Sequence, residues 1–344
     1  MPDKSERLSR RVDLDLFKTF LVVGMVLAHT IQLLQEPIDI FAKCISNYVN
    51  LVSFSGFLFA FGWGTTLSFG TNKVRTAWDR LRGPAKILLA FYLTAIAHLV
   101  LIDGAGWSAT RILDVATLMY LPGHGEFLAS LFAMSIVMIW LGKELSLVSG
   151  NPTCLIMVSG ISVLCGCFHI ESEDLPWVPI LIGTKNAVSF PLAPYAIWVF
   201  LGSYYAPRKG PPSHLEFFLA ALATYTFVAV AMTDDHLASR FPPSTLWVAG
   251  PALFLLLYRA VSMEIVKRIK LSPIITLPGH HILVFLVASN FILFALHNIF
   301  GRFVQNIIES AALTAIIIAI ISKLIELFYG SINSSRDAAP ISSV

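Results

Sequence analysis

Two ionisable residues, Lys18 and His29, lie eleven positions apart in the first apolar segment, RVDLDLFKTFLVVGMVLAHTIQLL. In an α-helix they share a face with Asp15, Val22 and Met25, because these positions follow steps of three and four. At a rise of about 1.5 Å per residue, His29 lies about 16 Å further along this helix than Lys18. An imidazole can exchange a proton near neutral pH, so this face could carry proton-transfer chemistry. The alternative is a histidine that only hydrogen-bonds a neighbouring helix.

A second group of ionisable residues stands in the run YLPGHGEFL, at the start of a later apolar segment. A carboxylate such as Glu126 needs a partner where a segment enters a membrane, and His124 is close by. On a further segment Asn290 and His297 are seven residues apart and share a face. No HxxxH or HExxH spacing supports a zinc site. Four histidines are expected only to hydrogen-bond other helices: His98, His280, His281 and His297.

The composition defines the environment of these residues. The chain has 344 residues, of which 56% are hydrophobic and 13% are charged, and its mean hydropathy is +0.75. So few polar residues cannot cover a soluble globule of this length, and the sequence therefore predicts an integral membrane protein. The formal net charge of +3 gives no indication of nucleic-acid binding. The first segment is too long and too rich in ionisable residues for a cleaved signal peptide.

Ten apolar stretches are long enough to cross a bilayer as helices, with short polar connections between them. The predicted fold class is an all-α, polytopic membrane helix bundle of about ten transmembrane helices. Residues 1–330 would form a single domain and residues 331–344 a disordered tail. The ten stretches are near 14–34, 46–69, 85–102, 124–142, 152–168, 188–206, 214–232, 245–262, 278–299 and 304–328.

Basic residues are distributed unequally between the two sides of this topology. Five fall on one side: Lys43, Arg111, Lys185, Arg240 and Arg302. Fifteen fall on the other side: Lys4, Arg7, Arg10, Arg11, Lys73, Arg75, Arg80, Arg82, Lys86, Lys143, Arg208, Lys209, Lys267, Arg268 and Lys270. By the positive-inside rule, both termini are predicted to be cytoplasmic.

Two connections on the predicted non-cytoplasmic side are longer than turns. Residues 103–123 begin with a glycine-rich bend and then favour a short interfacial helix capped by Ser108. Residues 169–187 carry Trp177 between two prolines. These connections either rim a cavity or lie on the lipid headgroups, and the sequence leaves both readings open.

The order of several segments resembles a known family. LDLFKTFLVVGMVLAH is similar to the first helix of the transmembrane acyltransferases, which include the acyltransferase-3 group, glucan succinyltransferases and heparan-α-glucosaminide N-acetyltransferase-like proteins. In that family a basic residue, ten spacers and a histidine mark the active-site helix, as Lys18 and His29 do here. The arginine that is usual in the family's first helix is Lys18 here. Where the family frequently has a histidine late in its ninth helix, this chain has Asn290 and His297. Similar segments follow in the family's order: LVSFSGFLFAFGWG, FPLAPYAIWVFLG, RFPPSTLWVAGPALFLLLY and LPGHHILVFLVASNFILF.

The resemblance implies an enzyme that moves an acyl group from cytoplasmic acyl-CoA, acetyl-CoA being the first candidate, to a hydroxyl or amine of a glycan or small-molecule acceptor. His29 would be the general base or the acyl carrier, and Glu126 would orient or recharge it. His124 and Glu126 are the next candidates for the base. Asp15 is expected to pair with Lys18 or Arg11. The coenzyme's phosphates would be held by basic residues that could equally be topological anchors: Lys18, Arg75, Arg80, Arg82 and Lys86.

Two other classes of function compete with this one. Ten spans with buried His, Lys and Glu could form a proton-coupled small-molecule transporter, although the halves show no inverted repeat of broken helices. A non-enzymatic membrane scaffold of the same fold is the second alternative. In each case the lipid bilayer is a partner and the cell membrane (inner or plasma) is the predicted location. Whether the chain forms a homo-oligomer is left open by the sequence.

Overall fold

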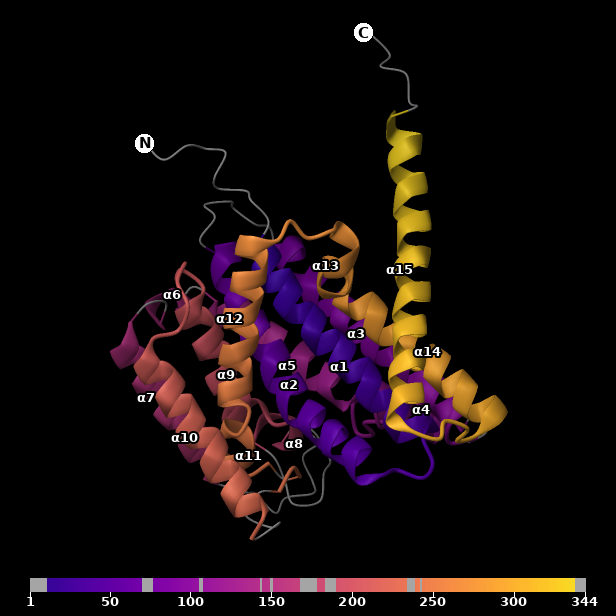
Figure 1. Ribbon diagram of the computed structural model, residues 1–344, viewed down its shortest axis with the longest axis horizontal. Helices are drawn as coiled ribbons and strands as arrows, with labels where there is room; N and C mark the ends of the chain where they lie inside the picture. The colour runs from indigo at the N-terminus through magenta and orange to yellow at the C-terminus, as the bar shows by residue number, and fades with distance from the viewer. Residues whose placement is uncertain are drawn as a thin grey trace.

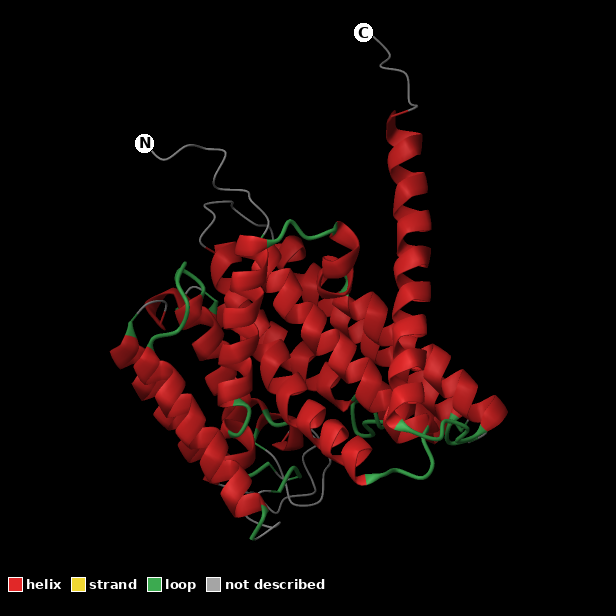
Figure 2. Ribbon diagram, viewed as in Figure 1, coloured by secondary structure: helices red, strands yellow, loops and turns green. Residues whose placement is uncertain are grey.

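The computed structural model describes residues 11–69, 77–104, 108–142, 144–148, 151–167, 178–182, 190–233, 239–241 and 243–337. Across these residues the chain is all-helical, which confirms the all-α part of the prediction, and one isolated bridge joins Gln35 and Val304 (Figure 2). The helices are α1 (Val12–Leu34), α2 (Ile40–Phe69), α3 (Ala77–Leu101), α4 (Ala109–Ala116), α5 (Glu126–Leu141), α6 (Leu145–Val148), α7 (Pro152–Cys167), α8 (Val178–Leu181), α9 (Leu192–Tyr205), α10 (His214–Ala231), α11 (Thr245–Ala249), α12 (Ala252–Arg268), α13 (Pro273–His280), α14 (Ile282–Phe300) and α15 (Ile307–Asp337).

Seven stretches of the described chain are helical, long and apolar enough to cross a membrane. They are α1, α2, α3, α10, the pair α11 and α12 taken together, α14 and α15. Helices α5 and α7 are apolar but only 16 residues long, and α9 has 14 residues. The protein is therefore an integral, multi-pass membrane protein.

Helix α13 lies at one end of the bundle, and α4, α8 and α11 lie at the other (Figure 1). We call these the upper and lower ends, as drawn. Helix α4 confirms the predicted short helix after Ser108, although the Ser108 hydroxyl pairs with Thr110 rather than with the backbone. Helix α15 ends at Asp337, within the segment 331–344 for which the sequence predicts a disordered tail.

Helix α1 occupies the centre of the bundle and packs against α2, α12, α13, α14 and α15 (Figure 1). Its predicted face is buried in the protein, since Asp15, Val22, Met25 and His29 are each less than a tenth exposed. This position follows from the sequence, because an ionisable side chain deep in a membrane helix must face protein or water rather than lipid.

Small residues bring α2 and α9 into close contact. A Cβ atom on Gly202 would lie 1.9 Å from the carbonyl oxygen of Phe59, and one on Gly62 would lie 2.0 Å from that of Val199. Backbones approach this closely only where side chains are absent, as is usual at helix crossings in membranes. This crossing holds the middle of α2, which lines the cavities described below.

The predicted span at 278–299 is broken into α13 and α14 at His281. The short helix α13 packs on the start of α1, where a Cβ on Gly279 would lie 1.8 Å from the carbonyl oxygen of Asp15. The Gly279 amide also donates to the Thr19 hydroxyl at 3.0 Å. The upper end of α1 is thereby fixed against α13 and the beginning of α14.

Candidate functional site

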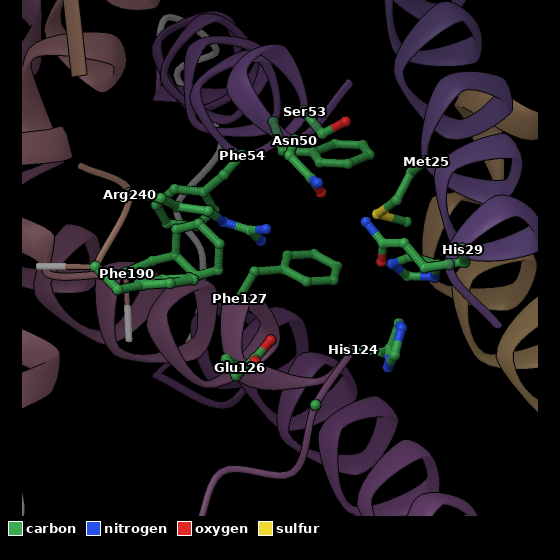
Figure 3. A pocket seen from close by; sticks show the side chains of 14 residues that line it. Met25, His29, Asn50, Ser53, Phe54, His124, Glu126, Phe127, Phe190 and Arg240 are labelled. Carbon is green, nitrogen blue, oxygen red and sulfur yellow. The ribbon is translucent and has the colours of Figure 1, made fainter. Parts of the chain in front are cut away.

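The lower half of the bundle contains a cavity of about 170 Å³, which we call the lower cavity. Aromatic side chains and a few polar groups line it, and they come from α1, α2, the start of α5 and the segments before α9 and α11 (Figure 3). His29, His124 and Glu126 lie together in it, so the structure brings together the three residues singled out from sequence. The full lining is Met25, His29, Gln32, Asn50, Ser53, Phe54, Phe57, Gly123, His124, Glu126, Phe127, Phe190, Arg240 and Phe241.

His29 is oriented by Asn290 of α14. The His29 Nδ1 and Asn290 Oδ1 atoms are 2.8 Å apart, and the Asn290 Nδ2 donates to the carbonyl oxygen of His124 at 3.4 Å. Because a carbonyl oxygen can only accept, this second contact assigns the nitrogen of the amide. The amide oxygen of Asn290 therefore faces His29, so the Nδ1 atom of His29 must carry the hydrogen. A neutral His29 then presents an unprotonated Nε2, the form required of a base or a nucleophile.

Three histidine rings follow one another toward the lower end. The centroids of His29 and His124 are 4.6 Å apart with the rings nearly perpendicular, and those of His124 and His98 are 6.1 Å apart. His98 Nδ1 lies 3.6 Å from Asp103 Oδ2, which also accepts a hydrogen bond from the Tyr120 hydroxyl. His98 therefore lies next to the site. The sequence predicts for His98 only a hydrogen bond to another helix.

The position of the His124 ring follows from an unusual backbone conformation. His124 has a φ of 68°, in the left-handed region that non-glycine residues rarely adopt, and it stands between Gly123 and Gly125. Such a residue costs about 1–3 kcal/mol and is found mainly where the surrounding structure determines it, often at functional sites. The turn places His124 against His29 and starts α5 at Glu126, whose carboxyl group lies at the cavity (Figure 3).

Arg240 reaches the lower cavity from the segment before α11. Its guanidinium carbon lies 4.7 Å from the ring centroid of Phe241 and 5.6 Å from that of Phe190, and its nitrogens point into the cavity (Figure 3). Burial lowers the pKa of this guanidinium, and the nearby Glu126 and Tyr195 raise it in part. Arginine nevertheless remains charged, so Arg240 is a fixed positive charge at the cavity.

A second cavity of about 340 Å³, the upper cavity, lies near the start of α1. Lys18 lines it, together with residues of α2, α3, α5 and α14. The Lys18 ammonium pairs with Asp15 Oδ1 at 2.8 Å, which confirms the predicted partner. The full lining is Lys18, Phe57, Ala60, Phe61, Gly64, Thr65, Ser68, Ile87, Phe127, Leu131, Ile282, Leu283 and Leu286.

Two phenylalanines separate the two cavities. Phe57 and Phe127 line both of them, and their rings are stacked with centroids 6.0 Å apart and an interplanar angle of 16°. Beyond the upper cavity a third cavity of about 200 Å³ shares Phe61, Thr65, Ser68 and Ile87 with it and is lined also by Arg80. A row of three cavities thus leads from the start of α3 to His29.

The predicted phosphate-binding residues differ in their surroundings. Arg80 lines the third cavity, whereas Arg82 is mostly exposed and pairs with Asp79 at 3.6 Å. Lys86 is exposed, and Arg75 lies outside the described residues. Of the predicted phosphate-binding residues, Lys18 and Arg80 therefore line neighbouring cavities, whereas Arg82 lies at the surface.

Sequence reasoning did not assign a role in the site to Arg240 or Asn290. The sequence predicts only that Asn290 shares a face with His297. Both residues contact α1, since His297 Nδ1 lies 2.8 Å from the carbonyl oxygen of Leu33 and Asn290 Oδ1 lies 2.8 Å from His29 Nδ1. Arg240 carried a signal that could have found it. It is one of five basic residues on the side that the positive-inside rule leaves poor in charge.

Comparison with protein-family models, curated proteins and solved structures finds no match to the chain.

Proposed function

We propose that the protein is an acyl-CoA-dependent membrane acyltransferase, with acetyl-CoA as the first candidate donor. The observation that carries this proposal is the orientation of His29. Asn290 holds the Nδ1 of His29, and Nε2 is left as the basic nitrogen. His29 lies in a cavity that Phe57 and Phe127 separate from a second cavity, which Lys18 lines. The resemblance of the α1 sequence to transmembrane acyltransferases supports the same conclusion.

In this proposal the chain crosses the cell membrane ten times, with α5, α7 and α9 as short spans and both termini in the cytoplasm. The upper end is then cytoplasmic. The support is the distribution of charge, because Arg11, Arg80 and Arg82 begin α1 and α3, and Lys267 and Arg268 end α12 beside α13. Cysteine labelling in sealed vesicles tests it: residues 103–123 and Arg80 should label from opposite sides, and labelling from one side would contradict the ten-span topology.

The donor would enter from the upper end with its phosphates near Lys18 and Arg80. Lys18 and His29 are separated by about 16 Å along α1, and the flexible pantetheine arm of coenzyme A would bridge this separation past Phe57 and Phe127. The thioester would then lie beside His29, where the basic Nε2 can act. Lysine serves such a site as a point charge and arginine as a planar fork.

The reaction would be acyl transfer to a hydroxyl or amino group. His29 Nε2 takes the proton of the attacking group, whose oxygen or nitrogen forms a bond to the thioester carbonyl carbon. The carbon–sulfur bond then breaks, and the sulfur takes the proton from His29, so that the products are the acylated acceptor and free coenzyme A. In the covalent variant Nε2 attacks the thioester carbon, the carbon–sulfur bond breaks and coenzyme A leaves as the thiolate. The acceptor then attacks the acyl-imidazole, the carbon–nitrogen bond breaks, and the proton of the acceptor passes to the thiolate. Glu126 and His124 would hold or relay the proton.

The test is transfer of a labelled acetyl group from acetyl-CoA by the purified full-length protein in lipid vesicles. His29→Ala should abolish transfer while acyl-CoA binding persists, because loss of a general base costs about 10²–10⁴-fold and loss of a covalent carrier more. The His29→Gln variant keeps a neutral hydrogen-bonding side chain and should be equally inactive. Near-normal activity of either variant would contradict the assignment.

A proton-coupled transporter remains the second candidate, because two cavities separated by an aromatic pair are also what a carrier with two gates requires. The two functions differ in a direct measurement. A carrier should exchange a labelled small solute across sealed vesicles without acyl-CoA, whereas an acyltransferase should release one coenzyme A for each acceptor modified. Absence of both activities would favour a non-enzymatic scaffold.

A further inference from the structure

The lower cavity has a charged end and a reactive end. Arg240 lies on one side with Phe54 and Phe190, and His29 and His124 lie on the other (Figure 3). The Arg240 Nε is buried without a hydrogen-bond partner, and no described carboxylate lies within 4.0 Å of its guanidinium. A buried guanidinium without a carboxylate partner is costly, and an anion bound at the nitrogens that point into the cavity would compensate its charge.

The groups around the cavity add a second constraint. Glu126, His29 and His124 are the other titratable residues of the lining, and Glu126 is close enough to influence Arg240 without forming an ion pair with it. Gln32, Asn50 and Ser53 supply neutral hydrogen-bonding groups. Such a mixture suits a small polyhydroxylated molecule more than an apolar one.

The size of the cavity limits what can enter it. Its volume is about 170 Å³, well below the roughly 300–1,000 Å³ of pockets for drug-sized ligands. The ligand, or the part of it that enters, therefore consists of only a few heavy atoms. An anionic group at Arg240 would leave room for a short polar chain that reaches His29.

We propose that the lower cavity binds a small polar acceptor that carries an anionic group, a carboxylate or a phosphate, held by Arg240, with its hydroxyl or amino group presented to His29. This assignment rests on the proposed acyl transfer in one respect, namely that the hydroxyl or amino group of the ligand is the group that reacts. Binding of the anion by Arg240 stands on the cavity itself. Short hydroxy acids and their phosphate analogues are the class of ligand that fits.

The first arm of the test measures the electrostatics of the cavity without any ligand. In full-length protein with its four cysteines replaced, Ser53→Cys introduces a thiol into the lower cavity. Its labelling rates are compared for a sulfonatoethyl and a trimethylammonium-ethyl methanethiosulfonate, which are of opposite charge. Replacing Arg240 by Gln should reduce the anion-to-cation rate ratio by about tenfold or more, because a fixed charge in a low-dielectric cleft concentrates ions of opposite sign.

Two controls make this arm specific. Thr65→Cys places the thiol in the upper cavity, where Arg240→Gln should leave the rate ratio unchanged; this also reports that the variant is folded. Arg240→Lys keeps the charge and should keep the anionic preference at position 53. A ratio at Ser53→Cys that does not respond to loss of Arg240 would overturn the proposal.

The second arm uses protection of the same thiol by small molecules. Glycerate or glycerol 3-phosphate should slow labelling of Ser53→Cys more than glycerol does, and Arg240→Gln should remove this difference. Comparing the two anions distinguishes a carboxylate site from a phosphate site. Equal protection by glycerol, or no protection by any of the three, would overturn the proposal. Neither arm uses acyl-CoA, so failure of acyl transfer and failure of anion binding are separate results.

Discussion

Replacing Asn290 tests the orientation of His29 without touching the imidazole. Leucine has a similar size but offers no acceptor, so Asn290→Leu leaves the His29 Nδ1 hydrogen unpaired at a position where Asn290 is only 1% exposed. An unsatisfied buried donor costs about 1–3 kcal/mol. The imidazole escapes this cost by moving its hydrogen to Nε2, which removes the unprotonated Nε2 that the proposed function requires.

The expected effect on turnover follows from this free energy. At about 1.36 kcal/mol for each factor of ten, a cost of 1–3 kcal/mol corresponds to a loss of about 5–150-fold in acyl-transfer rate. Asn290→Asp retains an oxygen acceptor toward His29, and it replaces the donor to the His124 carbonyl group by a carboxylate oxygen with a negative charge. It should stay within about tenfold of the unmodified protein, and it is the matched control.

The assay is release of free coenzyme A together with labelled product, in vesicles that contain equal amounts of folded protein. The double variant His29→Ala with Asn290→Leu provides the sharpest comparison. If Asn290 acts only by orienting His29, the double variant should be no less active than His29→Ala alone. The orientation argument would be refuted if the double variant lost activity by the product of the two single losses. It would also be refuted if Asn290→Leu left the activity unchanged.

Three further predictions follow from the cavities and the helix crossing. Gly202→Ala should lower the free energy of unfolding by about 1–3 kcal/mol or more, measured by denaturation in detergent, whereas Gly160→Ala, which meets no atom within 4 Å, should not. Phe127→Ala should join the upper and lower cavities, and the variant should then accept longer acyl chains in a comparison of acyl-CoA donors. Lys18→Gln should raise the Michaelis constant for acyl-CoA, and the exposed Arg82→Gln should change it little; equal effects would mean that the upper cavity does not select the donor.

The face of α1 could be predicted because it is a local property. Steps of three and four between Asp15, Lys18 and His29 need only a helix, and an ionisable residue in a membrane segment must turn toward protein. His124 and Glu126 could be singled out for a similar reason, since they stand at the start of an apolar run, where a carboxylate that enters a membrane needs a partner. Both signals lie within about fifteen residues of sequence.

Contacts between distant helices could not be predicted in the same way. The amide of Asn290 reaches His29 across 261 positions of sequence, and apolar segments contain almost no information about which of them will be neighbours. In a membrane, lipid is as apolar as leucine, so small residues and polar pairs determine the packing. Gly62 and Gly202 were the signal for the crossing of α2 and α9, but many glycines in the chain meet nothing.

Arg240 shows how a topological rule can also indicate function. In the predicted topology Arg240 lies on the non-cytoplasmic side, where the rule expects few basic residues. Arg240 stands immediately before the run FPPS, packs on Phe190 and Phe241, and directs its nitrogens to a cavity rather than to solvent. An arginine that departs from the charge bias and precedes a proline-rich turn is thus a candidate ligand-binding residue. In this chain it supplies a charge at one end of the lower cavity, opposite His29 and His124 at the other.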